Sequence, residues 1–271
     1  MNKTIGIIGC GNMGGGILTG IIEKKAADCT KVMVSDKSEA LLAALKIQYG
    51  ISTTTDNTKA AAFADILFLV VKHFLLEQVV SEIRDFVKPE TVIISVAAGK
   101  TISYISELFQ KEIKLIRIMP NLAALIGDSM TAYVPNELVT KEELAEAAQL
   151  FNSFGKAAQL TENLMDIFTA ISGSAPAYIC TMLDAMADAA VLGGVPRQTA
   201  YTIVEQAMLG TAKYLLETGT TPAALKDMVC TPGGTSIEAV AEIERLGVRP
   251  AIMSAVKVCA DKSAALAKPS K

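Results

Sequence analysis

The sequence has very little of the residue types that commonly build metal centres, disulfide frameworks and acid–base pairs. It contains one histidine, His73, no tryptophan, and five widely spaced cysteines without a C-x-x-C pair. A single histidine excludes a histidine-rich metal centre, and any Ser-His-Asp mechanism would depend on that one side chain. The odd number of isolated cysteines is typical of reduced thiols, so we expect neither a disulfide framework nor a zinc site.

Long apolar runs and an excess of positive charge are also absent. The densest apolar run, Ile66–Val71, has six residues, whereas a membrane span needs about 20. The first residues are too short and too interrupted by glycine for a signal peptide. The formal net charge is −3, and no basic block offers the footprint of a nucleic-acid-binding protein. We therefore expect a cytoplasmic protein that binds neither nucleic acid nor a membrane.

What the sequence does have is a large apolar fraction, 51% of its 271 residues. From residue 3 to about residue 161, short Val/Ile/Leu runs alternate with helical stretches, which is the rhythm of strand–helix–strand units around a buried parallel sheet. The predicted strands are Thr4–Gly9, Lys31–Asp36, Ile51–Thr54, Ile66–Val71, Thr91–Ala97, Leu115–Met119 and Met130–Val134. The predicted helices between them are Met13–Lys25, Ser38–Tyr49, Leu75–Val87 and Ile102–Phe109.

The second half of the chain has a helical pattern without a convincing strand. Glycine and proline clusters near residues 173–176, 193–196, 218–222, 231–234 and 247–250 divide it into several helices. We therefore predict an α/β fold with two domains, a doubly wound sheet over residues 1–161 and an all-α domain over residues 162–271.

The most informative motif is the glycine-rich segment Gly9–Gly14, which follows a predicted strand and opens a predicted helix. Glycine permits the turn and the approach of a pyrophosphate, and the helix N-terminus offers N–H groups to the anion. The sequence therefore predicts a dinucleotide site on this turn. Asp36, which ends the next strand, favours NAD through the ribose 2′-hydroxyl, whereas Lys37 beside it would meet the 2′-phosphate of NADP. The residues alone leave this choice open.

Further candidates follow other predicted strands, at Val71–His73, Ala97–Lys100 and Met119–Asn121, because strand carboxyl ends line the ligand crevice of an open sheet. Lys72 is either an adenosine contact or an ordinary exposed lysine, and the start of a helix is the simpler interpretation of His73. In the helical half, Cys230–Glu238 places hydroxyl groups at a helix start, where they either hold a substrate carboxylate or cap the helix.

Together these motifs resemble those of the Δ1-pyrroline-5-carboxylate reductase family, the enzymes of the last step of proline biosynthesis, along essentially the whole chain. The segments that carry the resemblance are Ile8–Met13, Val71-Lys72, Ser95–Gly99, Arg117–Asn121, Ser172–Tyr178, Leu225–Val229 and Thr231–Ser236. The motifs Ser172–Tyr178 and Leu225–Ser236 are highly specific in combination.

The resemblance implies a Rossmann domain, a helical domain that forms a homodimer, and rings of dimers as larger assemblies. It implies NADP as cofactor, with NADPH preferred and NAD left open, and reduction of 1-pyrroline-5-carboxylate to L-proline. The cofactor residues that it implies are Ile8, Gly9, Cys10, Gly11, Asn12, Met13, Ser35, Lys37, Asn57, Val70, Val71, Lys72, His73, Val96, Ala97, Ala98 and Asn121, and Asp36 joins them from the motif above. The substrate residues are Thr231, Gly234, Thr235 and Ser236, with Glu162 as a weaker candidate, and Ser236 or Thr235 takes the catalytic role at the ring nitrogen.

The chain departs from the usual family pattern at three places. Leu122-Ala123 stand where the family has Thr-Pro, His73 where it has proline, and Ser236 where it has threonine. Ser236 keeps the hydroxyl group. The change at residues 122 and 123 affects a loop beside the nicotinamide, so it bears on catalytic rate or substrate preference.

Three alternatives compete with imine reduction. A β-hydroxyacid-dehydrogenase-like oxidoreductase would need a catalytic lysine on the first helix of the second domain, and residues 172–194 contain none. A non-catalytic NADP-binding sensor is favoured only by Leu122-Ala123. A 2-hydroxy acid dehydrogenase would need a placed histidine with an arginine partner, and only His73 is available. Imine reduction suits a chain with one histidine, because the ring nitrogen can take its proton from water before binding.

Overall fold

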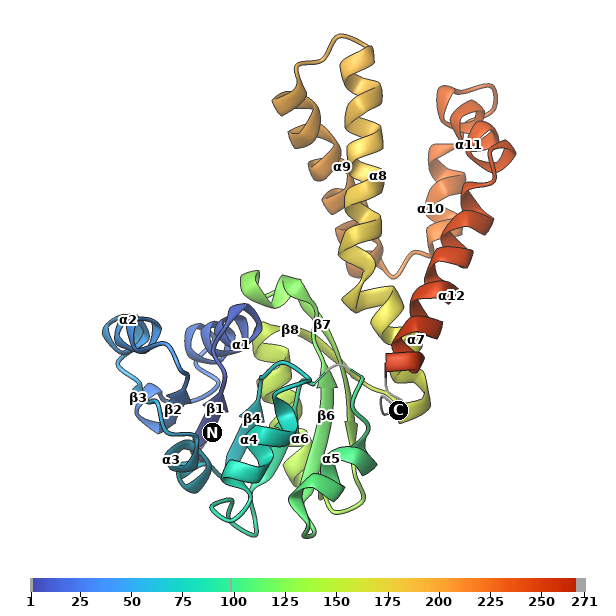
Figure 1. The fold of residues 1–271 in the computed structure, drawn as a ribbon. Helices are drawn as coiled ribbons and strands as arrows, with labels where there is room; N and C mark the ends of the chain where they lie inside the picture. Colours follow the sequence, from blue (N-terminus) through green and yellow to red (C-terminus); the bar gives the residue numbers. More distant parts are fainter. Residues whose placement is uncertain (1, 98, 267–271) are drawn as a thin grey trace. The chain divides into compact units, whose positions relative to one another are not determined.

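The computed structural model describes residues 2–97 and 99–266, and within them one sheet of eight strands forms the core of the N-terminal part (Figure 1). The order is β3-β2-β1-β4-β5-β6-β7-β8. Neighbours from β3 to β6 pair in parallel, β7 is antiparallel to β6, and β8 is parallel to β7. The strands are β1 (Ile5–Ile8), β2 (Val32–Ser35), β3 (Ser52–Thr54), β4 (Ile66–Leu69), β5 (Val92–Ser95), β6 (Lys114–Met119), β7 (Ser129–Pro135) and β8 (Gly155–Gln159).

Helices alternate with these strands and then replace them. The helices of the sheet region are α1 (Asn12–Glu23), α2 (Glu39–Tyr49), α3 (Asn57–Phe63), α4 (Leu76–Ile83), α5 (Ile102–Phe109), α6 (Lys141–Phe151) and α7 (Met165–Phe168). Short turns are η1 (Cys29–Lys31), η2 (Leu122–Ile126), η3 (Asn152–Phe154), η4 (Glu162–Leu164) and the π-helical turn η5 (Thr169–Gly173). The remaining helices are α8 (Ala175–Leu192), α9 (Arg197–Thr218), α10 (Pro222–Val229), α11 (Thr235–Arg245) and α12 (Val248–Leu266).

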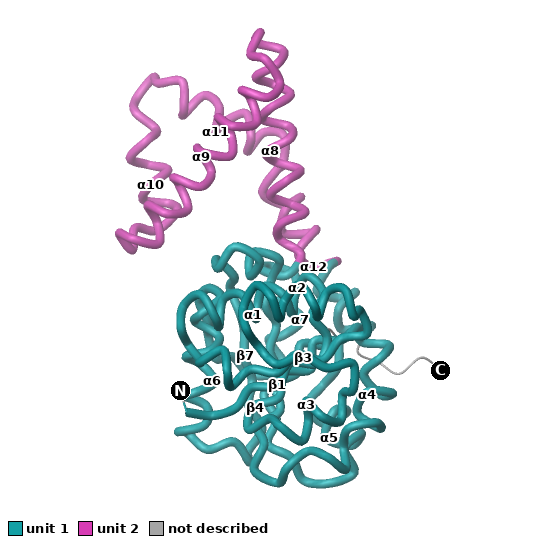
Figure 2. The backbone as a smooth tube through the Cα atoms, turned by 90° about the vertical axis from the view of Figure 1, so that its left-hand side faces the viewer, with its two compact units in different colours: residues 1–173, 259–271 teal, residues 174–258 magenta. Residues whose placement is uncertain are grey.

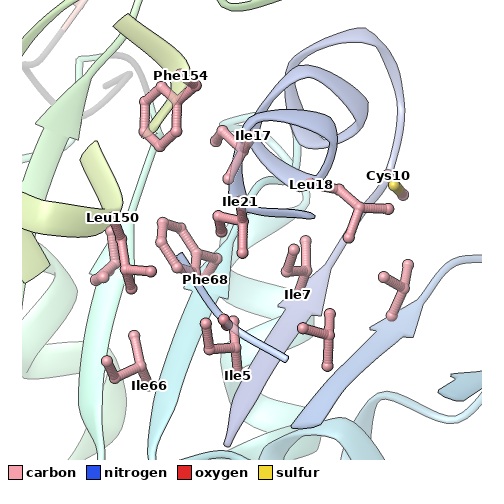
Figure 3. Packing of buried hydrophobic residues seen from close by; sticks show 14 of the residues in the cluster. Ile5, Ile7, Cys10, Ile17, Leu18, Ile21, Ile66, Phe68, Leu150 and Phe154 are labelled. Carbon is pink, nitrogen blue, oxygen red and sulfur yellow. The ribbon is translucent and has the colours of Figure 1, made fainter. Parts of the chain in front are cut away.

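Both faces of the sheet are buried, which explains the continuous apolar runs of its central strands. Ile5 and Ile7 of β1 and Phe68 of β4 pack against α1, α2 and α6 in one cluster, part of which Figure 3 shows. Leu67 and Leu69, which alternate with Phe68 along β4, pack against α3, α4 and α5 in the other. The central strands β1, β4, β5 and β6 therefore contribute to two cores, one on each side of the sheet.

The chain divides into two compact units, residues 1–173 with 259–271 and residues 174–258 (Figure 2). The first unit holds the whole sheet, and the second contains α8 to α11 and the first half of α12. The predicted domains, 1–161 and 162–271, divide the chain where strands give way to helices, and the compact units instead count residues 162–173 and the end of α12 with the sheet. The boundary between residues 161 and 162, which separates the predicted dinucleotide-binding domain from the predicted substrate and dimerisation domain, stays a prediction.

The predicted fold class, a doubly wound sheet followed by an all-α region, is confirmed. All seven predicted strands and all four predicted helices are present, and no strand occurs among described residues beyond β8. Three elements were not predicted, namely α3, α6 and β8. Strand β8 contains no β-branched or aromatic residue, and it forms because β7 offers it a parallel partner along five residue pairs.

One helical stretch, residues 162–192, is long and apolar enough to cross a membrane by length and composition alone, and 6% of its most apolar window is buried. Helices α8 and α9 expose large apolar side chains, among them Ile179, Met186, Ile203 and Leu209. Contiguous apolar surface, where it occurs, is typical of protein–protein or membrane interaction sites.

Candidate functional site

The glycine-rich turn joins β1 to α1 in a conformation that only glycine allows. Gly9 has a φ of 91°, its N–H donates to the carbonyl of Ser35 on β2, and a Cβ there would lie 2.5 Å from the carbonyl oxygen of Val70. A Cβ on Gly14 would lie 2.2 Å from the carbonyl oxygen of Gly9. Gly9 and Gly14 are therefore required for packing within the turn. Gly11 differs, because nothing lies within 4 Å of the Cβ that it lacks.

The open space at Gly11 lies at the N-terminus of the twelve-residue helix α1. Gly11 is the N-cap and supplies no side chain to the first N–H groups of the helix. Free N–H groups and the positive end of the helix dipole attract an anion, and the missing side chain gives it room. The turn therefore fits a pyrophosphate.

Cys10 and Asp36 connect this turn to the end of β2. The N–H of Cys10 donates to Oδ2 of Asp36 at 2.8 Å, and the N–H of Ser38 donates to Oδ1 at 3.0 Å. The Cys10 side chain is buried, and burial, together with the Asp36 carboxylate, raises the pKa of its thiol to about 12. Asp36 thus holds the turn in place, which is a role that its position in the sequence alone did not reveal.

Beside Asp36, a chain of hydrogen bonds links the side chains of Ser35, Asn57 and Glu82. The buried Ser35 donates its hydroxyl to Oδ1 of Asn57 at 2.7 Å, and Nδ2 of Asn57 donates to Glu82 at 3.0 Å. Lys37 is exposed at the same strand end. The three predicted residues Ser35, Lys37 and Asn57 therefore lie near the carboxyl end of β2.

The carboxyl ends of five strands lie side by side. In the sheet register Ile8 pairs with Ser35 and Leu69, and Ser95 pairs with Leu69 and Arg117. The predicted residues that follow these strands therefore gather at one edge, and they are Gly9–Met13, Asp36, Val70–His73, Val96, Ala97 and Asn121. Lys72 and His73 are exposed, and the His73 ring meets Phe74 edge-on at 5.5 Å. Ala98 lies outside the described residues.

Asn121, two residues after the end of β6, caps the turn η2. Its Oδ1 accepts from the N–H of Ala123 at 3.2 Å, and its Nδ2 donates to Oγ of Ser172 at 3.2 Å. Ser172 lies in the π-helical turn η5, a kind of turn that is frequent at functional sites. Sequence reasoning gave Ser172 no role, although it opens one of the motifs that carry the family resemblance.

Glu162 lies in the first unit, where it accepts two hydrogen bonds on Oε1. One comes from Nη1 of Arg117 at 3.0 Å, and the other from the N–H of Ile102 at 2.8 Å, at the start of α5. Arg117 is 4% exposed, and its Nε has no hydrogen-bond partner among the described residues. The Glu162 carboxylate therefore neutralises the buried Arg117 guanidinium and caps α5, independently of any contact with substrate.

Four of the five predicted substrate residues, Thr231, Gly234, Thr235 and Ser236, lie together in the second unit at the start of α11, whereas Glu162 lies in the first unit. The N–H of Gly234 donates to the carbonyl of Thr231 at 3.0 Å, and Gly233 has a φ of 65°. Gly234 is the N-cap and provides no side-chain cap, so the first N–H groups of α11 are not satisfied by it. Thr235 is exposed and Ser236 half-buried within the first turn. The arrangement can bind a carboxylate.

Comparison with known proteins identifies the family. A family model described as pyrroline-5-carboxylate reductase dimerisation matches residues 162–266, and one described as NADP oxidoreductase, coenzyme F420-dependent, matches residues 4–99. Pyrroline-5-carboxylate reductase of Escherichia coli is 43% identical over 99% of this chain and 100% of the relative.

Solved structures agree with this result. A pyrroline-5-carboxylate reductase from Coxiella burnetii has a TM-score of 0.95 at 30% identity, covering 99% of this chain and 100% of that one. Plasmodium falciparum pyrroline carboxylate reductase with NADP bound has a TM-score of 0.87 at 26% identity, covering 98% of this chain and 99% of that one. The sequence identity extends over both halves of the chain, and the predicted family resemblance is confirmed. The chain belongs to the pyrroline-5-carboxylate reductase family.

Proposed function

We propose that this protein reduces 1-pyrroline-5-carboxylate to L-proline with a nicotinamide cofactor. The observation that carries the proposal is the 43% identity to the Escherichia coli reductase over 99% of the chain, which includes the glycine-rich turn and the start of α11. The exposed hydroxyl groups and glycine-flanked turn of the second unit suit a small substrate with a carboxylate.

For the cofactor we propose NADP, with NADPH as the working form. The open space at Gly11 fits the pyrophosphate, and we assign Ser35, Lys37 and Asn57, near the end of β2, to the 2′-phosphate of the adenosine ribose. Each oxygen of Asp36 already accepts a backbone N–H, which lessens its capacity to bind a ribose hydroxyl. A solved relative with NADP bound supports the same choice. When bound, the cofactor supplies a hydride to the imine carbon.

The protein's own contribution is to bind the substrate and to orient its ring toward the cofactor. The first N–H groups of α11, with Thr231 and Gly234, hold the substrate carboxylate. The hydroxyl of Ser236, or of Thr235 beside it, donates a hydrogen bond to the ring nitrogen as its positive charge is lost. An imine that arrives protonated needs no general acid, so alignment of the two rings is the main contribution. Glu162 stays a weaker candidate, because Oε1 already accepts two hydrogen bonds.

For the assembly we propose a homodimer formed through the helical half, residues 162–271, with a ring of dimers as the larger form. The dimerisation family model over residues 162–266 and the exposed apolar side chains of α8 and α9 support this proposal. We place the protein in the cytoplasm, without a membrane or nucleic-acid partner.

The decisive experiment follows the absorbance of the reduced cofactor while 1-pyrroline-5-carboxylate is added. We expect oxidation with both cofactors and a higher kcat/KM with NADPH than with NADH. Ser236→Ala should lower kcat about 10- to 100-fold, the scale of one lost hydrogen bond to a charged group. Tight cofactor binding without oxidation would replace the proposal with that of an NADP sensor, and unchanged kinetics of Ser236→Ala would assign the nitrogen contact to Thr235.

A further inference from the structure

The side-chain amide of Asn121 is fixed at both ends. Its Oδ1 accepts from the N–H of Ala123, and its Nδ2 donates to the hydroxyl of Ser172 at 3.2 Å and approaches the carbonyl oxygen of Ser172 at 3.5 Å. A backbone N–H can only donate and a carbonyl oxygen can only accept. Only one orientation of the amide satisfies both partners, so the positions of its nitrogen and oxygen are determined.

The partners of Asn121 belong to three different segments. The hydroxyl of Ser172, in the π-helical turn η5, donates in turn to the carbonyl of Met130 on β7 at 3.3 Å, and Ser172 is buried. The N–H of Asn121 donates to Oγ of Ser129, at the start of β7, at 3.1 Å. The loop after β6 is thus tied to β7 and to η5 at a single residue.

Ala123 can donate a hydrogen bond to Asn121 only because it is not proline and has a backbone N–H. A proline at this position has no N–H and leaves Oδ1 of Asn121 without this donor. The usual family sequence has proline here, so this anchor belongs to chains that, like this one, carry another residue. The turn that follows is also packed on α1, because a Cβ on Gly16 would lie 2.9 Å from the backbone of Ala124.

We propose that the N–H of Ala123, together with Ser172, acts through Asn121 to position the loop after β6 for hydride transfer. The proposal rests on the proposed function. In it Asn121 is a positioning residue, since its oxygen is engaged by the loop and its nitrogen by η5, and the loop follows β6 at the strand edge where we propose that the cofactor binds. An error in alignment of the reacting rings costs rate more than affinity, because the rest of the cofactor provides most of the binding.

The test compares two adjacent prolines. Ala123→Pro removes the N–H that anchors Asn121, whereas Leu122→Pro introduces proline at the first helical position, where the N–H has no intrahelical acceptor. We expect Ala123→Pro to lower kcat about 3- to 10-fold with the Kd for NADPH changed less than about twofold. Leu122→Pro retains the N–H of Ala123, so it should lower kcat less than Ala123→Pro does. Equal losses in the two variants would overturn the proposal.

A double-mutant cycle separates the hydrogen bond from other effects of proline. If Ala123→Pro acts by releasing Asn121, it should add little to the loss in an Asn121→Ala background, because the bond is already gone. Multiplicative losses in the double variant would overturn the proposal.

Hydrogen exchange supplies a readout that does not depend on turnover. The Ala123 amide should exchange several-fold faster in Asn121→Ala than in the wild type, and Ser172→Ala should accelerate it less. If the wild type fails to oxidise NADPH with 1-pyrroline-5-carboxylate, the proposed function falls, and this exchange result still decides whether Asn121 anchors the loop. An unchanged exchange rate in Asn121→Ala would overturn the positioning role.

Discussion

At the scale of single residues, Arg117 and Glu162 show how a buried charge determines the role of its partner. The guanidinium lies on a strand of the sheet, where water is scarce, and the carboxylate of Glu162 is the negative group beside it. The same oxygen accepts the N–H of Ile102 at the start of α5. Removing one member of such a pair leaves the other without compensation, which costs more than the pair itself contributes.

We therefore predict that Glu162→Ala lowers the free energy of unfolding by about 1–3 kcal/mol, because a buried cation and a helix N-terminus both lose their acceptor. Glu162→Gln, which retains an acceptor oxygen, should lose less. Urea unfolding at fixed protein concentration measures both. Glu217→Ala is the control, since its ion pair with Lys213 is exposed and worth little. Wild-type stability in Glu162→Ala would contradict the assignment.

Cys10 gives a prediction about pH. Burial and the Asp36 carboxylate raise its pKa to about 12, so the thiol stays protonated and unreactive at pH 8. Iodoacetamide at pH 8 should modify Cys10 in the urea-unfolded chain and leave it unmodified in the native protein, as peptide mass spectrometry can determine. Because the folded pKa exceeds the unfolded value, this group contributes stability below about pH 9 that is lost as the pH rises toward 12. Rapid modification of Cys10 by iodoacetamide in the native protein would contradict this prediction.

At the scale of elements, helix α1 depends on glycines for two separate contacts. Besides the approach of Gly16 to the backbone of Ala124, a Cβ on Gly20 would lie 2.6 Å from Cβ of Phe154 in η3. Helix propensity favours alanine over glycine by about 1 kcal/mol. At Gly16 and Gly20 the steric cost of an added Cβ outweighs this gain in helix propensity. The atoms that the Cβ would contact belong to the backbone or to the fully buried Phe154 and cannot easily move.

A pair of substitutions in this helix tests which effect dominates. Gly20→Ala should destabilise the protein by about 1–3 kcal/mol through overpacking against Phe154. Gly15→Ala should be neutral or stabilising by up to about 1 kcal/mol, because nothing lies within 4 Å of its added Cβ. Thermal unfolding of both variants, at equal concentration, measures the difference. Equal stabilities would mean that η3 moves away at little cost.

The elements also show which parts of the structure the sequence could reveal. Patterns of apolar residues located the central strands, and glycine spacing located the glycine-rich turn between β1 and α1. Helix α6 was missed although Thr140 and Glu143 form a capping box ahead of Leu144 and Leu150, a signal that is readable in the sequence. Strand β8 carries no such signal, since its pairing with β7 is a long-range contact.

The same distinction holds for the site. The residues that follow strands were predicted because strand ends gather at one edge. The engagement of Asp36 with Cys10 and Ser38, and of Glu162 with Arg117, depends on side-chain orientation that spacing does not encode. Ser172 escaped notice for the same reason, because its partner Asn121 lies 51 residues away in the sequence.

At the scale of the whole molecule, the exposed apolar side chains of the second unit predict self-association. Leu209 on α9 and Met253 on α12 are 59% and 68% exposed, and residues 162–266 match a dimerisation model. The interfaces of obligate homodimers are about as apolar as the hydrophobic core of a single domain, so exposed side chains of this kind are expected at such an interface.

Light scattering coupled to size-exclusion chromatography tests this prediction. The wild type should have at least twice the chain mass of 28.6 kDa, and the double variant Leu209→Glu with Met253→Glu should shift toward the monomer. Ile47→Glu is the matched control, because Ile47 is 87% exposed on α2 of the other unit and should leave the mass unchanged. A monomeric wild type at micromolar concentration would refute self-association.

The division of α12 between the two units has a consequence for fragments of this protein. The chain leaves the first unit after residue 173 and returns to it at residue 259, and there Ser263 donates its hydroxyl to Asp166 on α7 at 2.7 Å. The second unit is therefore an insertion rather than an appendage. A gene truncated at residue 173 would yield a sheet domain that lacks its last helical segment, and the missing segment would have to be supplied as a separate peptide to complete it.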